Sequence, residues 1–469
     1  MGRMDELAQL LGKQYVLTGA DAEPYTVDWR GRYSGKALAV VKPGTTQELA
    51  AVVRWCAANK VPMVPQGGNT GLCGGATPDG AGSAVVLVMS RLNAIRHVDT
   101  DNDTMVVEAG CILQAVQQAA QDAGRLFPLS LAAEGSCTIG GNLSTNAGGT
   151  QVLRYGNARD LVLGLEVVTP QGEVWNGLRG LRKDNTGYDL RNLYIGSEGT
   201  LGFITAATLK LFPLPVAQCT ALLALQSIDN AVAVLAAARK GFGAALTGFE
   251  LMAGNCLHGV TRCYPEQRIP FEGDHANLPW YALLELSDSE SESHARERFE
   301  HVLGACIEAG LVVDAVVAEN VTQSRALWHL RESIPLSEKE FGKSIKHDVS
   351  IPASRMAEFV DTTNAALQAR FPGVEHVIFG HLGDGNLHYN VAPGTAYTED
   401  ELLAEQPAVH GLVHDRVHAF QGSISAEHGV GQLKRDYLPK YKDPIELALM
   451  KRIKAALDPD GLMNPGKVL

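Results

Sequence analysis

The sequence predicts an α+β protein built from more than one domain. Short apolar strands alternate with helices through the first half of the chain. The second half follows a β-α-β-β-α-β order, which is typical of an antiparallel sheet covered by helices on one face. The chain has 469 residues, and at one domain per roughly 100–200 residues this length corresponds to two or three domains.

The first half supplies a regular series of elements. Apolar runs predict strands over 37–43, 83–90 and 104–111, two turn-linked strands over 161–175, and a strand over 201–215 that ends at two prolines. Apolar residues at helical spacing predict helices over 46–60 and 112–124. Glu48 lies in the first turn of the former, and Gly124 closes the latter.

A domain boundary is expected at Pro213 and Pro215, where the glycine-rich first half ends. Beyond it, the pattern predicts strands over 220–227, 281–287 and 311–318, and helices over 229–240 and 291–310. A final helix is expected over 445–458.

The composition excludes several classes of protein. A net charge of −12 argues against nucleic-acid binding, which needs a basic face. The eight cysteines are scattered without a Cys-x-x-Cys pair, which is typical of a reduced protein. The N-terminal residues lack the apolar core of a signal peptide, and no stretch has 18 consecutive apolar residues. We therefore expect a cytoplasmic protein.

Glycine is unevenly distributed. Nearly half of the 49 glycines lie between Gly67 and Gly202, mainly in three clusters at 66–75, 135–149 and 196–204. Backbone N–H groups in such loops can surround an anion, so the clusters suggest a long, phosphate-bearing cofactor. The G-x-G-x-x-G fingerprint of dinucleotide-binding sites is missing. The nearest match to a P-loop, at 461–467, is followed by Val468, where the motif requires serine or threonine. Glycines in ordinary turns are the alternative.

These clusters carry a resemblance to a known family. The segments PQGGNTGLCGG (65–75), GSCTIGGNLSTNAGG (135–149), LRYG (153–156), LRKDNTGYDL (181–190) and IGSEGTLGFIT (195–205) resemble the FAD-binding domain of the vanillyl-alcohol-oxidase-type flavoproteins. The second half, with GHLGDGNLHYN (380–390), SAEHGVG (425–431) and LDPDGLMNPGK (457–467), resembles the FAD-linked D-2-hydroxy acid dehydrogenases. Within that group, PQGGNTG is similar to the D-2-hydroxyglutarate dehydrogenases.

The resemblance implies a domain plan. It places a two-subdomain FAD-binding domain at 37–215, with residues 1–36 packed on it, and a substrate domain at 216–420. The C-terminal segment 421–469 would return to the FAD domain. FAD is expected to be non-covalent, since the glycine loops hold no histidine and neither Cys73 nor Cys137 lies in an attachment pattern. The residues that the resemblance assigns to FAD are Pro65, Gln66, Gly67, Gly68, Asn69, Thr70, Gly71, Gly74, Gly75, Gly135, Ser136, Thr138, Gly140, Gly141, Asn142, Asn146, Gly148, Gly149, Tyr155, Gly156, Glu198, Gly199, Gly202, Ile204 and Asn464.

A histidine pair suggests a divalent metal. Zn²⁺ is expected, and Mn²⁺ and Fe²⁺ are the alternatives. Asp384-Gly385 is a strong signal for a two-residue hairpin turn, which would place His381 opposite His388 with Cβ atoms about 4.5–5.5 Å apart. Such a pair can chelate one metal ion with Glu427 as a further ligand, although two hydrogen-bonded strand histidines are the alternative. The resemblance favours the metal.

A second histidine set has helical spacing. His410, His414 and His418 follow one another at i, i+4 and i+8. The family motifs do not include them, so we interpret them as structural.

The remaining site residues follow from the resemblance. Arg331, Lys346 and Asn390 match substrate-contacting positions, and His428 matches the general base. The family pattern has threonine four residues after the arginine, where this chain has Pro335.

The implied reaction is oxidation of a D-2-hydroxy acid, most simply D-2-hydroxyglutarate, to the 2-oxo acid. D-lactate, D-malate and glycolate are the alternatives, and a non-catalytic metal- or nucleotide-binding protein is a remote one. An electron acceptor such as electron-transfer flavoprotein or quinone, and a homodimer, are implied partners.

Overall fold

The computed structural model describes residues 2–469, and the chain forms two compact units. Unit 1 comprises the chain up to Gly148, then Gly156–Leu214 and Glu427–Leu469, and unit 2 comprises Gly149–Tyr155 and Pro215–Ala426. Segment 149–155 falls inside the range expected for the FAD domain, yet it groups with unit 2 because its short helix α5 (Val152–Tyr155) packs on strand β13 (Leu246–Ala253).

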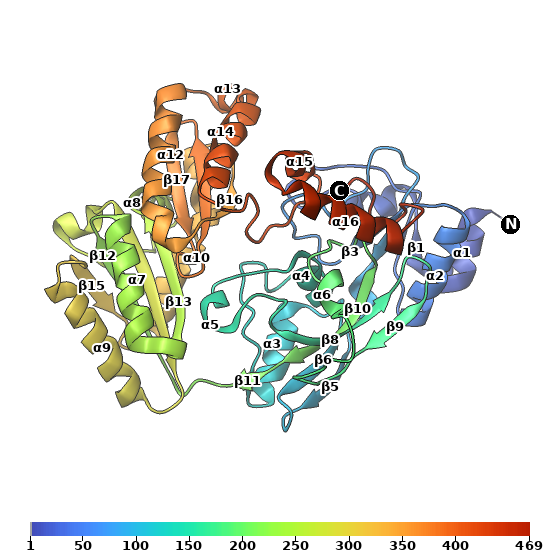
Figure 1. The fold of residues 1–469 in the computed structure, drawn as a ribbon, viewed down its shortest axis with the longest axis horizontal. Helices are drawn as coiled ribbons and strands as arrows, with labels where there is room; N and C mark the ends of the chain where they lie inside the picture. Colours follow the sequence, from blue (N-terminus) through green and yellow to red (C-terminus); the bar gives the residue numbers. More distant parts are fainter. Residues whose placement is uncertain (1) are drawn as a thin grey trace. The chain divides into compact units, whose positions relative to one another are not determined.

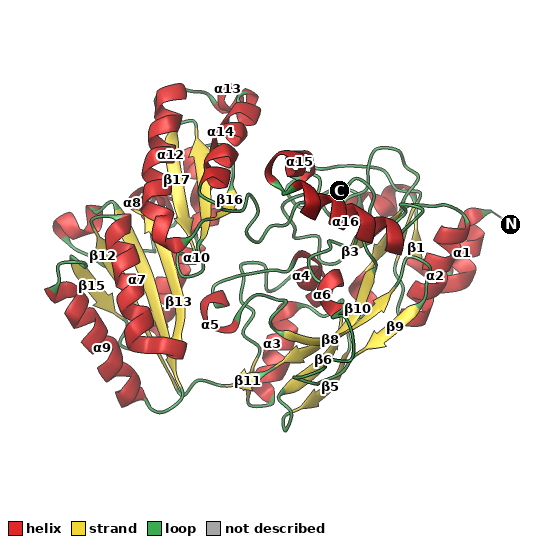
Figure 2. Ribbon diagram, viewed as in Figure 1, coloured by secondary structure: helices red, strands yellow, loops and turns green. Residues whose placement is uncertain are grey.

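Unit 1 contains two main sheets (Figures 1 and 2). The first has the order β1-β2-β4-β3, and β2, β4 and β3 are parallel. The second is antiparallel, with the order β5-β6-β10-β8-β9. The strands are β1 (Val16–Leu17), β2 (Ala39–Val41), β3 (Met63–Gln66), β4 (Val85–Val88), β5 (Ile95–Asp99), β6 (Thr104–Glu108), β8 (Val162–Val168), β9 (Val174–Gly177) and β10 (Phe203–Lys210), with a separate pair β7 (Arg125–Leu126) and β11 (Phe212–Pro213).

Three helices of unit 1 form where the periodicity predicts them: Thr46–Ala58, Leu113–Asp122 and Pro444–Leu457. α2 (Thr46–Ala58) begins after Thr45, whose hydroxyl accepts the Glu48 N–H at 3.0 Å, a cap worth about 1 kcal/mol. Its apolar side, including Leu49 and Val53, is buried in the core against the parallel sheet. The other helices are α1 (Arg3–Leu11), α3 (Leu113–Asp122), α4 (Ile139–Thr145), α6 (Arg191–Tyr194), α15 (Leu438–Tyr441) and α16 (Pro444–Leu457).

Unit 2 is built on one antiparallel seven-stranded sheet with the order β15-β12-β14-β13-β17-β18-β16. Besides β13, the strands are β12 (Ala217–Leu225), β14 (Trp280–Asp288), β15 (Asp314–Val317), β16 (Asp348–Ser350), β17 (Glu375–Gly380) and β18 (Asn386–Ala392). The helices are α7 (Ile228–Phe242), α8 (Gly254–Cys263), α9 (Glu292–Glu308), α10 (Val321–Glu332), α11 (Ile334–Ser337), α12 (Met356–Arg370), α13 (Glu399–Ala404) and α14 (Gln406–Ala419).

The expectation of helices on one face is too simple for this sheet. α7 and α9 pack together on β12, β13 and β14, where Phe242 stacks on Phe299. α10 also contacts β12 and β14, and its Trp328 donates a hydrogen bond of 2.6 Å to Glu285 of β14. Nearly every residue of β12, β13 and β14 is buried, so both faces of the central sheet are covered.

The hairpin that carries the paired histidines differs from the predicted one. β17 and β18 pair Phe379 with His388, two residues out of the expected register. The His381 carbonyl accepts the N–H groups of Asp384 and Gly385 at 3.2 and 3.1 Å, so residues 381–385 form one tight turn and the strand ends at Gly380. The two-residue turn and the His381–His388 strand pairing are therefore wrong.

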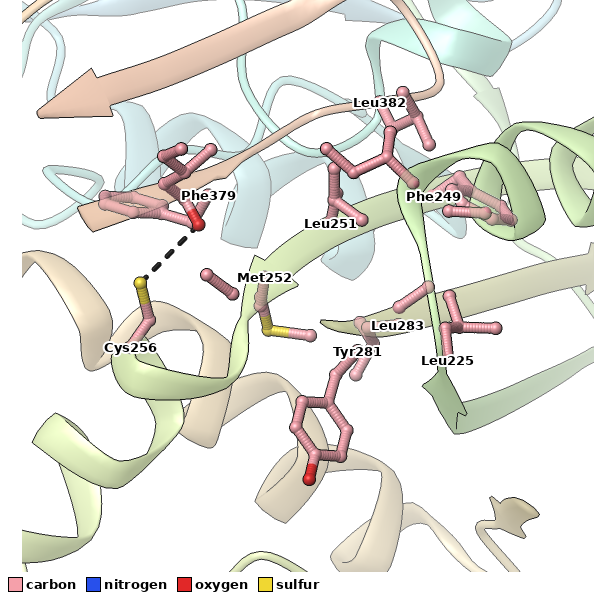
Figure 3. Packing of buried hydrophobic residues seen from close by; sticks show 14 of the residues in the cluster. Leu225, Phe249, Leu251, Met252, Cys256, Tyr281, Leu283, Phe379 and Leu382 are labelled. Carbon is pink, nitrogen blue, oxygen red and sulfur yellow. Dashed lines mark hydrogen bonds between the residues drawn. The ribbon is translucent and has the colours of Figure 1, made fainter. Parts of the chain in front are cut away.

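An apolar core supports this hairpin from below (Figure 3). Phe379 and Leu382 lie beside Phe249, Leu251 and Met252 of β13, and all five side chains are buried. The Cys256 thiol donates to the Ile378 carbonyl at 3.5 Å. The hairpin is therefore held rigidly where it presents its polar residues.

Two further findings concern membrane-spanning helices and disulfides. Among the described residues, none of the helices is long and apolar enough to cross a membrane. None of the eight cysteines forms a disulfide, and seven of them are buried.

Candidate active site

A cleft opens within unit 1. Most residues that the resemblance assigns to FAD line the cleft. They are Pro65, Gln66, Gly67, Gly68, Asn69, Thr70, Gly71, Gly75, Thr138, Gly140, Gly141, Asn142, Glu198, Gly199, Gly202 and Ile204.

The glycines of the cleft have two different functions. A Cβ on Gly68 would lie 2.1 Å from the Ser136 carbonyl oxygen, so this glycine allows two backbone segments to touch. Gly199 has φ +70°, and its Cβ would lie 2.5 Å from Cγ of Pro65. A Cβ on Gly71 would meet no protein atom within 4 Å, so this position is open toward the cleft.

Glu198 joins the C-terminal segment to the cleft. The carboxylate of this half-buried residue accepts the N–H groups of Val430 and Gly431 at 2.6 and 2.8 Å. Burial raises the pKa of Glu198 despite these bonds and the nearby Lys434. Asn464 donates to the carbonyls of Gly75 and Glu198 at 2.9 and 2.8 Å, which fixes the end of the chain beside the same loop.

His428 is placed at the cleft by this attachment. It is half-buried and lines the cleft, and its Nε2 lies 3.7 Å from Oε1 of Glu427. The expected base therefore lies on the wall of the expected cofactor site, within the same unit.

Several other residues assigned to FAD lie outside the lining, and they shape the loops instead. Gly74, with φ +68°, packs under the ring of Tyr33, and Asn146 has the left-handed conformation that ends α4. Gly149 and Tyr155 belong to unit 2. The remaining residues outside the lining are Gly135, Ser136, Gly148, Gly156 and Asn464.

In unit 2, a buried glutamate links two of the predicted site residues. Glu250 on β13 is 1% exposed, and its Oε2 accepts Nε and Nη2 of Arg331 at 2.9 and 2.8 Å. Its Oε1 lies 2.7 Å from Nδ1 of His381. Burial alone would raise the pKa of Glu250, but His381 and Arg331 outweigh it and hold that pKa below its usual value.

A second glutamate holds the other expected substrate residues. Glu338 forms an ion pair with Lys346, and its Oε1 accepts Nδ2 of Asn390 at 2.9 Å. Oδ1 of Asn390 accepts the His347 N–H at 3.3 Å. Both expected substrate cations thus have an internal carboxylate partner, so a further positive charge would strengthen the attraction for an anionic substrate.

The two histidines of the hairpin approach each other despite the register shift. The ring centroids of His381 and His388 are 5.8 Å apart. Asp348 lies opposite His388 in the β16–β18 pairing, and its Oδ1 is 4.0 Å from His388 Nδ1. Because Glu250 lies at Nδ1 of His381, it favours the tautomer whose Nε2 carries a lone pair for a metal ion.

Comparisons with known proteins agree with this geometry. Residues 37–177 match the FAD binding domain, and residues 214–468 match the C-terminal domain of the FAD linked oxidases. The chain is 42% identical to a D-2-hydroxyglutarate dehydrogenase of Xanthomonas citri pv. viticola, over 96% of this chain and 93% of the relative. The mitochondrial D-2-hydroxyglutarate dehydrogenase of Bos taurus is 39% identical, over 99% of this chain and 83% of the relative. The chain belongs to the family of FAD-linked D-2-hydroxy acid dehydrogenases.

Solved structures place the fold of this dehydrogenase. p-Cresol methylhydroxylase superposes with a TM-score of 0.77 at 18% identity, over 99% of this chain and 96% of that chain. An alkyldihydroxyacetonephosphate synthase gives 0.73 at 17% identity, over 98% and 84%. The predicted vanillyl-alcohol-oxidase-type fold is confirmed.

FAD is therefore the cofactor, and the residues of the cleft fit it. Lysine and arginine do not occur among the described lining residues, so a pyrophosphate group depends on backbone N–H groups, which the glycine loop can supply. Oδ1 of Asn464 is buried without a hydrogen-bond partner among the described residues, which leaves one acceptor for a ligand N–H or water.

The cysteines of the cleft are consistent with the expected non-covalent cofactor. Cys73 and Cys137 are buried in its lining, and burial raises the pKa of the Cys137 thiol, which disfavours the nucleophilic thiolate. The Cys73 thiol donates to the Gly429 carbonyl at 3.4 Å.

Sequence reasoning missed the carboxylates Glu250, Glu338 and Asp348. Each lies in an ordinary apolar or helical context, and only its contacts reveal a role. A charged residue inside an otherwise apolar strand, as in FELMA (249–253), is the one available signal for Glu250.

Proposed function

We propose that this dehydrogenase oxidises D-2-hydroxyglutarate to the corresponding 2-oxo acid, with His428 as the general base. Curated relatives of that name, 37–42% identical over nearly the full chain, support the substrate. Arg331 and Lys346 offer two separate cations, which suits an acid with two carboxylates.

The residues divide the chemistry between them. The α-hydroxyl loses its proton to the His428 imidazole, whose usual pKa lies close to working pH. The glycine loops of unit 1 would hold FAD, which when bound would supply the two-electron oxidation: the α-hydrogen would leave as hydride and C2 would become a carbonyl. Arg331 and Lys346 orient the acid by its carboxylates, and Asn390 offers an additional polar contact.

A divalent metal fits the donor set proposed for it. His381 and His388 supply imidazole nitrogens and Glu427 a carboxylate, a combination that suits Zn²⁺. Such an ion would polarise the substrate hydroxyl. It would also add positive charge beside Arg331 and Lys346, which are each paired with an internal carboxylate. Removal of the metal by EDTA should abolish turnover, and zinc should restore it.

The base is tested by rapid mixing of the oxidised holoenzyme with D-2-hydroxyglutarate in the absence of oxygen. His428→Ala should keep its FAD and slow flavin reduction by about 10²–10⁴-fold, the usual contribution of a general base. Flavin reduction at the wild-type rate would overturn the assignment.

The substrate is tested by comparing kcat/KM for D-2-hydroxyglutarate, D-malate, D-lactate and glycolate with an artificial electron acceptor. Lys346→Met should reduce the preference for diacids, whereas the control Lys343→Met, which removes an exposed lysine paired with Glu399, should not. D-lactate and glycolate stay in the comparison because Pro335 is exposed on α11 and brings no hydroxyl group. A preference for either would replace the proposed substrate.

A further inference from the structure

Three buried histidines meet in unit 2, apart from the residues assigned above to catalysis and metal binding. His410 and His414 lie one turn apart on α14, and His347 directly precedes β16. All three are buried, and one ring nitrogen from each lies within 4.8 Å of the others. The next histidine of the same helix series, His418, is exposed.

The spacing of the nitrogens is close to that of a metal site. Nε2 of His347 and Nδ1 of His410 form a hydrogen bond of 2.9 Å, and the rings of His410 and His414 stack with centroids 5.4 Å apart. Two ligands of a tetrahedral ion with metal–nitrogen bonds of 2.0–2.1 Å are about 3.3 Å apart. Small side-chain rotations therefore bring three nitrogens to bonding distance.

The hydrogen bonding of His347 prepares one ligand atom. Its Nδ1 lies 2.8 Å from the Tyr389 carbonyl oxygen, so Nδ1 carries the proton and donates it. Nε2 then holds a lone pair that accepts the Nδ1–H of His410, and a bound metal ion would take the place of that proton. Histidines that bind metals commonly donate their other ring N–H to a backbone carbonyl in this way.

We propose that His347, His410 and His414 bind one divalent late-transition-metal ion, with Zn²⁺ and Co²⁺ as representative ions. Three imidazoles suit these ions, and a water or hydroxide completes a tetrahedral set. The site is distinct from the one assigned to His381, His388 and Glu427. Its ion connects α14 to the segment that carries Lys346, so it stabilises unit 2.

The site is tested by adding Co²⁺ to FAD-loaded full-length protein that has been freed of metal by a chelator. The parent variant carries His388→Ala, which disables the other metal site. It should bind one equivalent of Co²⁺ with the visible absorption of a tetrahedral imidazole complex, and its melting temperature should rise with Co²⁺ concentration.

Adding His410→Gln or His414→Gln to the parent should weaken Co²⁺ binding by more than about 100-fold and remove the rise in melting temperature. Adding His418→Gln, the matched change on the same helix, should change neither. The unmutated protein should hold two equivalents of zinc by elemental analysis. A parent variant that binds no Co²⁺, or His410→Gln and His414→Gln proteins that bind it as well as the parent, would overturn the proposal. The far-ultraviolet circular dichroism spectrum and a cooperative thermal transition confirm that unit 2 of each variant is folded.

Discussion

Two buried glutamates on neighbouring strands should respond in opposite ways to the same substitution. Glu250 on β13 is 1% exposed and accepts hydrogen bonds from Arg331, which is itself 5% exposed. Glu285 on β14 is also buried, but its partners are the neutral groups of Trp328 and Thr220. Arg331 and His381 lower the pKa of Glu250, whereas burial raises the pKa of Glu285.

Glu250→Gln should destabilise unit 2. The change keeps the volume of the side chain but leaves the Arg331 guanidinium buried beside a neutral amide. Removing one partner of a buried ion pair costs about 3–5 kcal/mol. At about 2–4 °C per kcal/mol for a unit of this size, the melting temperature should fall by about 6–20 °C at pH 7.

Glu285→Gln should stabilise the protein at neutral pH, because the amide oxygen can still accept from Trp328 while the buried negative charge is removed. Because the folded-state pKa of Glu285 is raised, the contribution of this residue to stability is present below its unfolded pKa, about 4.3, and is lost as the pH rises through the folded value. The advantage of Glu285→Gln should therefore shrink as the pH is lowered toward 4. The contribution of Glu250 has the opposite dependence, since its lowered pKa makes it effective above about pH 4 and lost as the pH falls through the folded value.

Thermal unfolding of the FAD-loaded wild type and the two variants from pH 4 to 8 tests this reasoning. Metal affinity gives a second measurement. Glu250→Gln removes the carboxylate that orients His381, and loss of such a partner commonly weakens metal affinity about 10–100-fold. Equal shifts in melting temperature for the two variants, or no shift for Glu250→Gln, would refute the argument from charge pairing.

The remaining predictions concern the cleft. Gly68→Ala should lower the melting temperature of the protein even without FAD, because its Cβ would overlap the Ser136 carbonyl. Gly71→Ala should leave that temperature unchanged and weaken FAD binding. Fluorescence titration with FAD separates the two effects. Acid precipitation should release all of the flavin into the supernatant, and flavin that stays with the protein pellet would show a covalent bond. Glu198→Ala should lower FAD affinity and slow turnover, since it frees Val430 and Gly431 next to His428; unchanged flavin content and kcat would contradict this.

The long, local motifs of the sequence determined much of this protein by themselves. The glycine clusters located the cleft that is expected to hold FAD, because a glycine is needed wherever backbone must approach backbone, and that need is visible in the local sequence. The periodicity placed α2, α3, α7, α9 and the strands β12, β14 and β15 to within a few residues, since these elements depend on contacts between near neighbours, but it did not predict β13.

Only the tertiary structure decided how charges are paired. Glu250 reaches His381 across 131 positions of sequence, and His347 reaches His410 across 63. Such partners carry no mark of their pairing in the sequence. The pairing of β13 with β17 brings Glu250 and His381 together, and the packing of helix α14 within unit 2 brings His410 to His347. The hairpin shows how far a local motif predicts structure. Asp384-Gly385 indicated a turn correctly, but hydrogen bonds to the His381 carbonyl fixed the length of the turn and the register of the strands.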